Sequence, residues 1–268
     1  MGANIKSLRT RIKSVDSTLH LTKAMGLVAS SKIRKANLAM MKGREYATAL
    51  KKSINLLCSS AECAKSPFLR PYNDSGATAL VVVAGDRGLA GGYNANIFRL
   101  MREYPDADVF AIGKRSCERY GKPFVSSEKF SLSESNELAQ KLCDAFIKGE
   151  YTRIGIVSTE YVSMMTQTAT LNWLLPLEKG EDTESAGVVF EPDELTILNC
   201  AVKEYISGMI AVAVRESFAC EVAARRMAMD SAGKNAQQMI DDLQLQYNRA
   251  RQGAITQEIT EIVAGSGS

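Results

Sequence analysis

Residues 5–57 read IKSLRTRIKSVDSTLHLTKAMGLVASSKIRKANLAMMKGREYATALKKSINLL, and no proline interrupts them. Apolar or small residues recur at spacings of three and four, the pattern of a helix whose seam packs against a second helix. A helix from Ala3 to Leu57 would form a rod of roughly 80 Å at 1.5 Å per residue. The expected seam consists of Ile5, Leu8, Ile12, Val15, Leu19, Thr22, Gly26, Ala29, Ile33, Ala36, Met40, Gly43, Ala47, Leu50, Ile54 and Leu57.

The end of the chain predicts the second helix. No proline follows Pro192, and the acidic pair Asp193 and Glu194 suits a helix start. The expected seam of this helix runs from Phe218 through Val222, Arg225, Met229, Ala232, Ala236, Met239 and Leu243. Two long helices at the ends of one chain bury both seams most simply as an antiparallel coiled coil.

The segment between the helices alternates short β-rich runs with helical stretches, which predicts a small parallel-sheet domain. The fold class is therefore α/β, with a long antiparallel coiled coil of the terminal helices and a central Rossmann-like domain. The expected parts are the N-terminal helix 1–66, the central domain 67–192 and the C-terminal helix 193–268. Within the domain we expect strands at 79–86, 108–113 and 153–161, helices at 96–104 and 136–148, an edge strand at 166–175 and a mobile loop at 176–192.

Charge is spread unevenly along the chain. The first 52 residues hold twelve Lys and Arg residues against Asp16 and Glu45, a net +10, so the remainder must carry −7 for the total to be +3. Such asymmetry points to an acidic partner for the N-terminal arm. Nucleic acid is disfavoured because aromatic residues are sparse in this arm and the pI is only about 8.5. An acidic protein loop also suits the arm better than an anionic membrane surface, because a loop needs no flat basic face.

Several classes of site find little support in the composition. The six cysteines are scattered without CxxC spacing, so a zinc site is not expected. His20 is the only histidine, and we interpret it as a helix-surface residue with no acidic group to orient it. No apolar run approaches the roughly 20 residues that span a bilayer, and the N-terminus lacks an apolar signal core, which favours a cytosolic location.

The segment GDRGLAGGYN, residues 85–94, lies where nucleotide-binding loops occur, between a strand and a helix. It lacks the Gly-Lys-Ser/Thr of a P-loop, and its glycines do not fit GxGxxG. We therefore interpret it as a tight turn that needs positive φ angles rather than as a phosphate site. With no acid/base constellation elsewhere, the chain is expected to be neither an enzyme nor a cofactor-binding protein.

The C-terminal stretch mixes polar and β-branched residues without a clean apolar stripe, which fits a helix surface or a helix surrounded by a partner. Its run RQGAITQEITEIVAGSGS, 251–268, closely resembles the signature of the gamma subunit of F-type ATP synthases, in the bacterial form. Ser266 departs from the usual alanine. The signature positions that match are Ile255, Thr256, Glu258, Glu261, Gly265 and Ser268.

Three further blocks resemble the same family: residues 9–36, 86–94 and 224–252. Ala90 stands where many members have cysteine. The resemblance implies a central rotor shaft that couples proton translocation to ATP synthesis or hydrolysis. Its implied partners are the alpha and beta subunits of the catalytic ring, the epsilon subunit and the membrane rotor ring of c subunits, on the cytoplasmic side of the cell membrane. Neither nucleic acid nor nucleotide would contact the chain.

The resemblance also implies contact residues. Lys23 and Met25 match positions near the acidic lever loop of beta, and Arg251, Gln252, Thr256 and Glu258 match positions that hydrogen-bond the catch loops of the ring. A long cysteine-bearing insertion, typical of the thiol-regulated chloroplast form, is not found. The alternative function is a non-catalytic coiled-coil scaffold, which would share the rods but leave the C-terminal signature unexplained.

Overall fold

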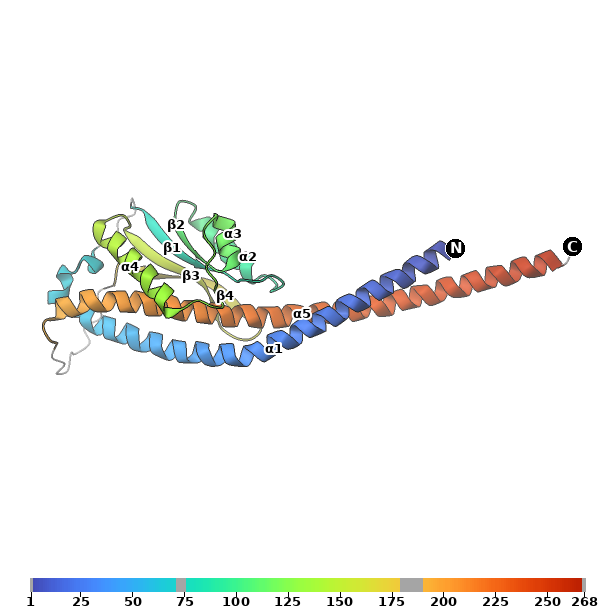
Figure 1. The fold of residues 1–268 in the computed structure, drawn as a ribbon, viewed down its shortest axis with the longest axis horizontal. Helices are drawn as coiled ribbons and strands as arrows, with labels where there is room; N and C mark the ends of the chain where they lie inside the picture. Colours follow the sequence, from blue (N-terminus) through green and yellow to red (C-terminus); the bar gives the residue numbers. More distant parts are fainter. Residues whose placement is uncertain (1, 71–75, 179–189, 267–268) are drawn as a thin grey trace. The chain divides into compact units, whose positions relative to one another are not determined.

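The computed structural model describes residues 2–70, 76–178 and 190–266, with side chains from residue 5 to residue 265. Two long helices confirm the expected rods: α1 spans Gly2–Cys58 and α5 spans Glu194–Ser266 (Figure 1). Contacts group the chain into two compact units, one formed by residues 1–30 with 225–268 and the other by 31–224. The division into segments 1–66, 67–192 and 193–268 stays a prediction.

Both units contain an antiparallel pairing of α1 with α5. In the first unit Leu19 clusters with Ala236 and Ile240, and Gly26 lies against Met229. In the second, Met40 clusters with Ala219, while Gly43 lies against Val212 and Gly208 against Leu50. Because numbers rise along α1 as they fall along α5, the helices run in opposite directions. None of the sixteen expected seam residues of α1 is exposed.

The expected seam of α5 is wrong at one position. Met239 is 45% exposed, whereas its neighbour Ile240 is buried at 5%. Both residues are apolar, and both fit a spacing of three or four from Ala236 and Leu243. Which of the two is buried depends on which face of α5 packs against α1. That face includes Gly233, which lies near Thr22 of α1.

The central domain is a four-stranded sheet in the order β2-β1-β3-β4. The strands β1 (Thr78–Val83), β2 (Asp108–Ile112) and β3 (Arg153–Tyr161) are parallel, and β4 (Gln167–Leu175) pairs antiparallel with β3. The sheet is therefore mixed rather than purely parallel. The loop expected at 176–192 falls mostly outside the described residues.

Helices cover both faces of this sheet. Alternate residues of β1 point to opposite faces, as in any strand. On one face Val81 and Val83 pack with α4 (Leu132–Lys148) and with the paired parts of α1 and α5. On the other, Leu80 and Val82 pack with α2 (Tyr93–Leu100) and α3 (Lys114–Tyr120). The result is a three-layer domain built on the helix pair of its own unit.

Two helical features escaped the sequence reading. The short α3 was not expected, and α4 begins four residues before the expected Asn136. A local signal was present, because Ser131 and Glu134 form a capping box in which each side chain accepts a hydrogen bond from the other residue's backbone N–H. The helix expected at 96–104 begins at Tyr93 as α2 and ends in a 3-10 turn, Met101–Glu103.

One described helix, α5, contains a window long and apolar enough to cross a membrane, and 61% of that window is buried inside the protein. The apolar part packs on the sheet: Leu198, Val202, Ile206 and Ile210 are wholly buried in the larger core cluster. This is the pattern of a core helix, whose apolar face is covered by its own domain.

Candidate functional site on the helix pair

The six residues singled out by resemblance all lie in the first unit, but in two separate groups. Lys23 and Met25 lie on α1 near the part of α5 around Met229, whereas the other four lie near the end of α5. Twenty-two residues separate Met229 from Arg251, about 33 Å along a helix. Met25 is half-buried, and the other five side chains are exposed: Lys23, Arg251, Gln252, Thr256 and Glu258.

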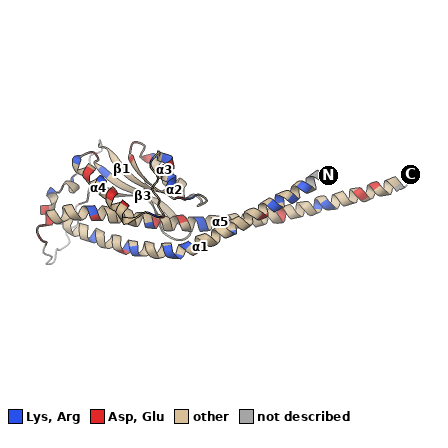
Figure 2. Ribbon diagram, in the orientation of Figure 1, with Lys and Arg blue, Asp and Glu red and all other residues tan. Residues whose placement is uncertain are grey.

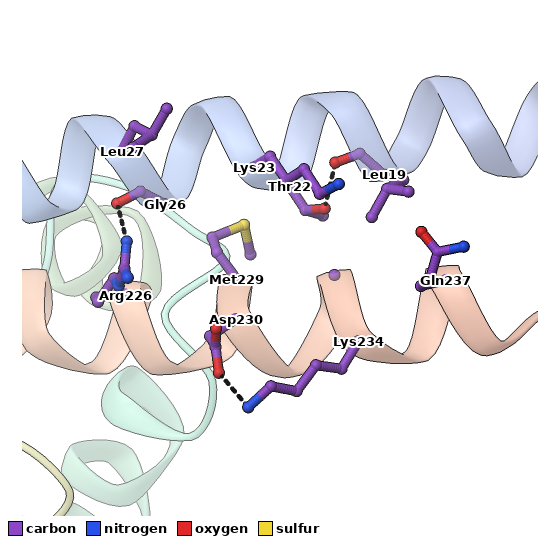
Figure 3. A pocket seen from close by; sticks show the side chains of 11 residues that line it. Leu19, Thr22, Lys23, Gly26, Leu27, Arg226, Met229, Asp230, Lys234 and Gln237 are labelled. Carbon is purple, nitrogen blue, oxygen red and sulfur yellow. Dashed lines mark hydrogen bonds and ion pairs between the residues drawn. The ribbon is translucent and has the colours of Figure 1, made fainter.

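Lys23 lines a groove of about 470 Å³ between α1 and α5 (Figure 3). The groove exists because Gly26 and Gly233 carry no side chains where the two helices face each other. Leu19, Leu27 and Met229 supply apolar walls, and Leu27 is 69% exposed. At the rim, Lys234 pairs with Asp230 at 2.8 Å, whereas Lys23 forms no ion pair with the described residues. Lys and Arg residues recur along the N-terminal part of α1 (Figure 2).

Arg226, which no sequence pattern singled out, links the two helices across the groove. Arg226 donates from Nη1 to the backbone oxygen of Gly26 at 3.0 Å (Figure 3). Ser30 Oγ donates to the same oxygen at 2.9 Å. Glycine brings the backbones close enough for this arginine to reach a carbonyl in the middle of another helix. No local sequence signal announces such a contact, because 200 residues separate its partners.

We expect Gly26→Ala to stabilise the helix pair by about 1 kcal/mol, since alanine is that much better than glycine inside a helix. An added Cβ would meet Met229 Cβ at 3.6 Å and Arg226 Nη1 at 3.7 Å, which are ordinary contacts. Thermal unfolding followed by helical circular dichroism measures the effect. Ala29→Gly, at the next seam position, is the reverse control and should destabilise; a loss of stability in Gly26→Ala would contradict the open groove.

The last turns of α5 form an unpaired tip. In the first unit, Thr22 lies by Gly233 and Gly26 by Met229. Extended along both helices, this register places Gly2 beside Gly253, so roughly the last dozen residues of α5 project about 20 Å beyond α1. Figure 1 shows the C-terminal end of α5 continuing past the N-terminal end of α1.

An apolar stripe runs along this tip, although the sequence analysis found no clean stripe. Its members follow spacings of four, three and one, which lie on one face of a helix. They are Ile255, Ile259, Ile262 and Val263, exposed by 48%, 56%, 66% and 64%. Isolated exposed apolar residues are common, but four on one face of an unpaired helix mark an interaction surface.

The stripe does not continue the coiled-coil seam. The seam of α5 passes through Leu243, Tyr247, Ala250 and Ala254, which are buried or half-buried. At about 100° per residue, the stripe lies roughly 130° round the helix from that seam. On the seam side the tip instead carries Gln257, which donates to Glu261 at 2.8 Å. A longer α1 would therefore cover polar groups and leave the stripe exposed.

The loop Gly85–Asn94 organises the central domain. Asp86 accepts hydrogen bonds from the backbone N–H groups of Lys114, Ser127 and Glu128 and from Ser126 Oγ, at 2.6–3.1 Å. Burial alone would raise the pKa of Asp86, but these bonds hold it below its ordinary value. Asn94 accepts from the Gly85 N–H at 2.9 Å. The polar side chains of this loop are therefore engaged in hydrogen bonds that hold the domain together, in line with its interpretation as a turn.

The expectation of positive φ angles in this loop holds for only one of its glycines. Gly91 has φ 57°, and the other left-handed residue is Leu89 at 59°. Gly85 is required for space: an added Cβ would lie 2.7 Å from Cδ of Glu221, a carboxylate of α5 that is only 2% exposed. A phosphate would meet two carboxylates here, those of Asp86 and Glu221, which further disfavours a nucleotide site.

The histidine and the cysteines can now be placed. His20 is on the surface as expected, but an acidic neighbour does lie near it: Nε2 stands 3.7 Å from Asp16 Oδ2, one turn earlier. Five of the six thiols are buried, and all six are free. Burial raises the pKa of Cys58 to about 11 and of Cys143 to about 12. In the described ranges, no three His, Cys, Asp or Glu residues gather as metal ligands.

Comparison with known proteins places the chain in a family. A family model described as ATP synthase matches residues 4–268. The sodium-ion-specific ATP synthase gamma chain of Acetobacterium woodii is 35% identical over 299 residues, covering 99% of both chains. The ATP synthase gamma chain of Xanthomonas axonopodis pv. citri is 37% identical over 282 residues, covering 98% of both.

Solved structures agree on the fold. A chain of the Euglena gracilis mitochondrial ATP synthase, solved as OSCP, F1 and c-ring, superposes with a TM-score of 0.65 at 17% identity. The match covers 98% of this chain and 94% of that one. A rotor chain from the same organism gives a TM-score of 0.63 at 16% identity, over 95% of this chain and all of that one. With bacterial relatives matched over nearly its whole length, this chain belongs to the ATP synthase gamma chain family.

Proposed function

We propose that this chain is the central rotor shaft of an F-type ATP synthase, and that it turns inside the ring of alpha and beta subunits without catalysing a reaction itself. The observation that carries the proposal is the unpaired tip of α5 with its apolar stripe. A helix that projects about 20 Å beyond its own partner and exposes four β-branched side chains is built to be surrounded.

The six proposed contact residues form two groups, one at the tip of α5 and one near the groove, and each group would contact the catalytic ring at a different height. Arg251 and Glu258 are seven residues apart and share one side of the tip, beside the stripe, while Gln252 and Thr256 are four apart and share the other. Exposed hydrogen-bonding groups that flank an apolar stripe suit polar loops around an apolar sleeve. Lys23, about 33 Å further down, would face the acidic lever loop of beta from the rim of the groove.

Rotation acts through asymmetry. Arg226, Lys23 and the groove occupy one side of the helix pair, so a turn of the shaft presents different surfaces to each catalytic subunit. Each subunit conformation would bind those surfaces unequally, and that differential affinity is what any shift of conformation requires. Nucleotides would bind the ring and not this chain.

The remaining proposed partners are other subunits of the complete ATP synthase. The central domain would meet the epsilon subunit and the membrane ring of c subunits, which places the chain peripherally on the cytoplasmic side of the cell membrane. The scaffold alternative is less favoured, because it would leave the C-terminal family signature, which includes Thr256 and Glu258 beside the stripe, unexplained.

The first test uses this chain mixed with the alpha and beta subunits of the same organism. We expect a complex whose ATP hydrolysis requires the chain, and a fall of roughly tenfold or more when Arg251 and Gln252 are both changed to alanine, since each loses charged or polar contacts to the ring. Lys42→Ala, an exposed change elsewhere on α1, is the control. Unchanged hydrolysis in the double variant, or no complex at all, would contradict the proposal.

A further inference from the structure

Open sheets with helices on both faces usually hold ligands at one place. This is the crevice outside the carboxyl ends of two neighbouring strands whose crossover helices lie on opposite faces. Here that place is between β1 and β3, because β1 leads into α2 on one face and α4 leads into β3 from the other. In this protein the crevice is filled by the protein's own α5.

Four side chains of α5 enter it within two turns of helix. The carboxylate of Glu221 lies close against Gly85, just beyond the end of β1, and accepts a hydrogen bond from the Arg87 N–H at 3.4 Å. Ser217 bonds Tyr93 Oη at 2.7 Å. The other two meet the end of β3: Cys220 Sγ reaches the oxygen of Thr159 at 3.4 Å, and Glu216 Oε1 accepts the N–H of Tyr161 at 2.9 Å.

The same end of β3 is joined to α1. Arg44 donates from Nη2 to Glu216 Oε1 at 2.5 Å and to the oxygen of Tyr161 at 2.6 Å. The hydrogen bond with Glu216 raises the pKa of Arg44, which keeps the guanidinium charged. The Glu216 side chain is only 14% exposed, although that of Arg44 is 44% exposed, so the carboxylate end of the pair is the sheltered one. One carboxylate thus ties together α1, α5 and the sheet.

These bonds differ in kind from the packing around them. Apolar contacts between a sheet and a helix resist separation, but they resist sliding and twisting weakly, because dispersion has little directional preference. Hydrogen bonds and close-packed backbone contacts fix both distance and angle. A helix that must rotate together with a domain needs hydrogen bonds and close backbone contacts of this kind. In this protein they are gathered in the crevice.

We propose that this crevice is a torque socket: Glu216, Ser217, Cys220 and Glu221 of α5, with Arg44 of α1, lock the central domain to the helix pair so that rotation passes between them. The inference rests on the proposed rotor function. These are positioning residues, because they transmit motion to contacts that lie elsewhere. The crevice that binds ligands in other open α/β sheets is here a mechanical joint within one chain.

The experiment uses the complete enzyme, assembled in vesicles with the organism's own subunits. Variants Arg44→Ala, Glu216→Ala and Gly85→Ala are compared with Glu204→Ala, an exposed glutamate of the same helix. Two activities are measured: ATP hydrolysis, and ions transported per ATP hydrolysed. We expect hydrolysis close to that of the unmodified enzyme, because the tip is untouched, and a transport ratio lowered by roughly two- to thirty-fold, the range of changes along a coupling path.

Glu216→Gln provides a graded variant, because its amide oxygen can still accept the Tyr161 N–H but no longer pairs with a charge; we expect an intermediate ratio. Thermal unfolding is followed through Trp173, the only tryptophan, which lies on β4. Normal ratios in all variants would overturn the socket. Transport and hydrolysis falling in parallel with thermal stability would reduce it to a structural role and overturn it too. If the unmodified chain supports no hydrolysis, the rotor function itself fails.

Discussion

Replacing Ile255 and Ile259 together by aspartate will prevent the chain from supporting ATP hydrolysis in the complex with alpha and beta subunits. Burying an isoleucine contributes about 1.5–3 kcal/mol, so losing two removes several kcal/mol before any charge is considered. An unpaired carboxylate in an apolar sleeve costs more still. We expect association weaker by roughly a thousandfold or more, measured by titrating the chain into the alpha and beta subunits.

The matched control adds the same two charges to the other side of the tip, by Gln257→Asp and Thr260→Asp. These residues are exposed and lie away from the stripe. We expect the control to bind within about tenfold of the unmodified chain, because a polar rim contributes little to affinity. Equal losses in both variants would mean that added charge, and not the apolar stripe, determines the effect.

Gly113→Ala will destabilise the central domain severely. Gly113 follows β2 with φ 91° and ψ 140°, a region that residues with side chains rarely adopt. An added Cβ would stand 1.9 Å from the oxygen of Ala84, a backbone atom just beyond the end of the neighbouring strand β1 that cannot rotate away. We expect a loss on the order of 4 kcal/mol or more, or a failure to fold, measured by thermal unfolding through Trp173 fluorescence.

Gly121→Ala separates the two causes. Gly121 also has a positive φ, 62°, but nothing lies within 4 Å of the added Cβ. Its expected cost is only the backbone strain, about 1 kcal/mol. If the two variants lost the same stability, the clash with Ala84 would not be the reason for glycine at position 113.

The long helices illustrate what periodicity can predict. Along α1 the alternating spacing of three and four selected a face on which none of the sixteen residues is exposed, although apolar residues such as Leu21, Leu27 and Leu38 lie off that face and are exposed. On α5 the same rule selected Met239 over Ile240, since two adjacent apolar residues fit it equally well. The strands β1, β2 and β3 were equally visible as β-branched runs, whereas the direction of β4 was not.

The candidate site also has parts that the sequence predicted and parts that only the structure revealed. The tip residues Arg251, Gln252, Thr256 and Glu258 came from a local motif, and their exposure agrees with a contact role that stays a proposal. The stripe could have been found from its spacing alone. By contrast, the groove at Gly26 needed the position of Gly233, and the bond from Arg226 needed the register of two helices paired at a distance of 200 residues.

The sequence by itself determined the features that depend on neighbours along the chain: two proline-free helices, a β-rich centre, the basic arm and the family to which they belong. The tertiary structure alone decided the features that depend on what approaches from elsewhere. Gly85 is glycine because the carboxylate of Glu221 arrives there from another helix, and the pKa of Asp86 lies below its ordinary value because four donors converge on it. Local spacing sets which face of an element is apolar, whereas only packing sets what that face meets.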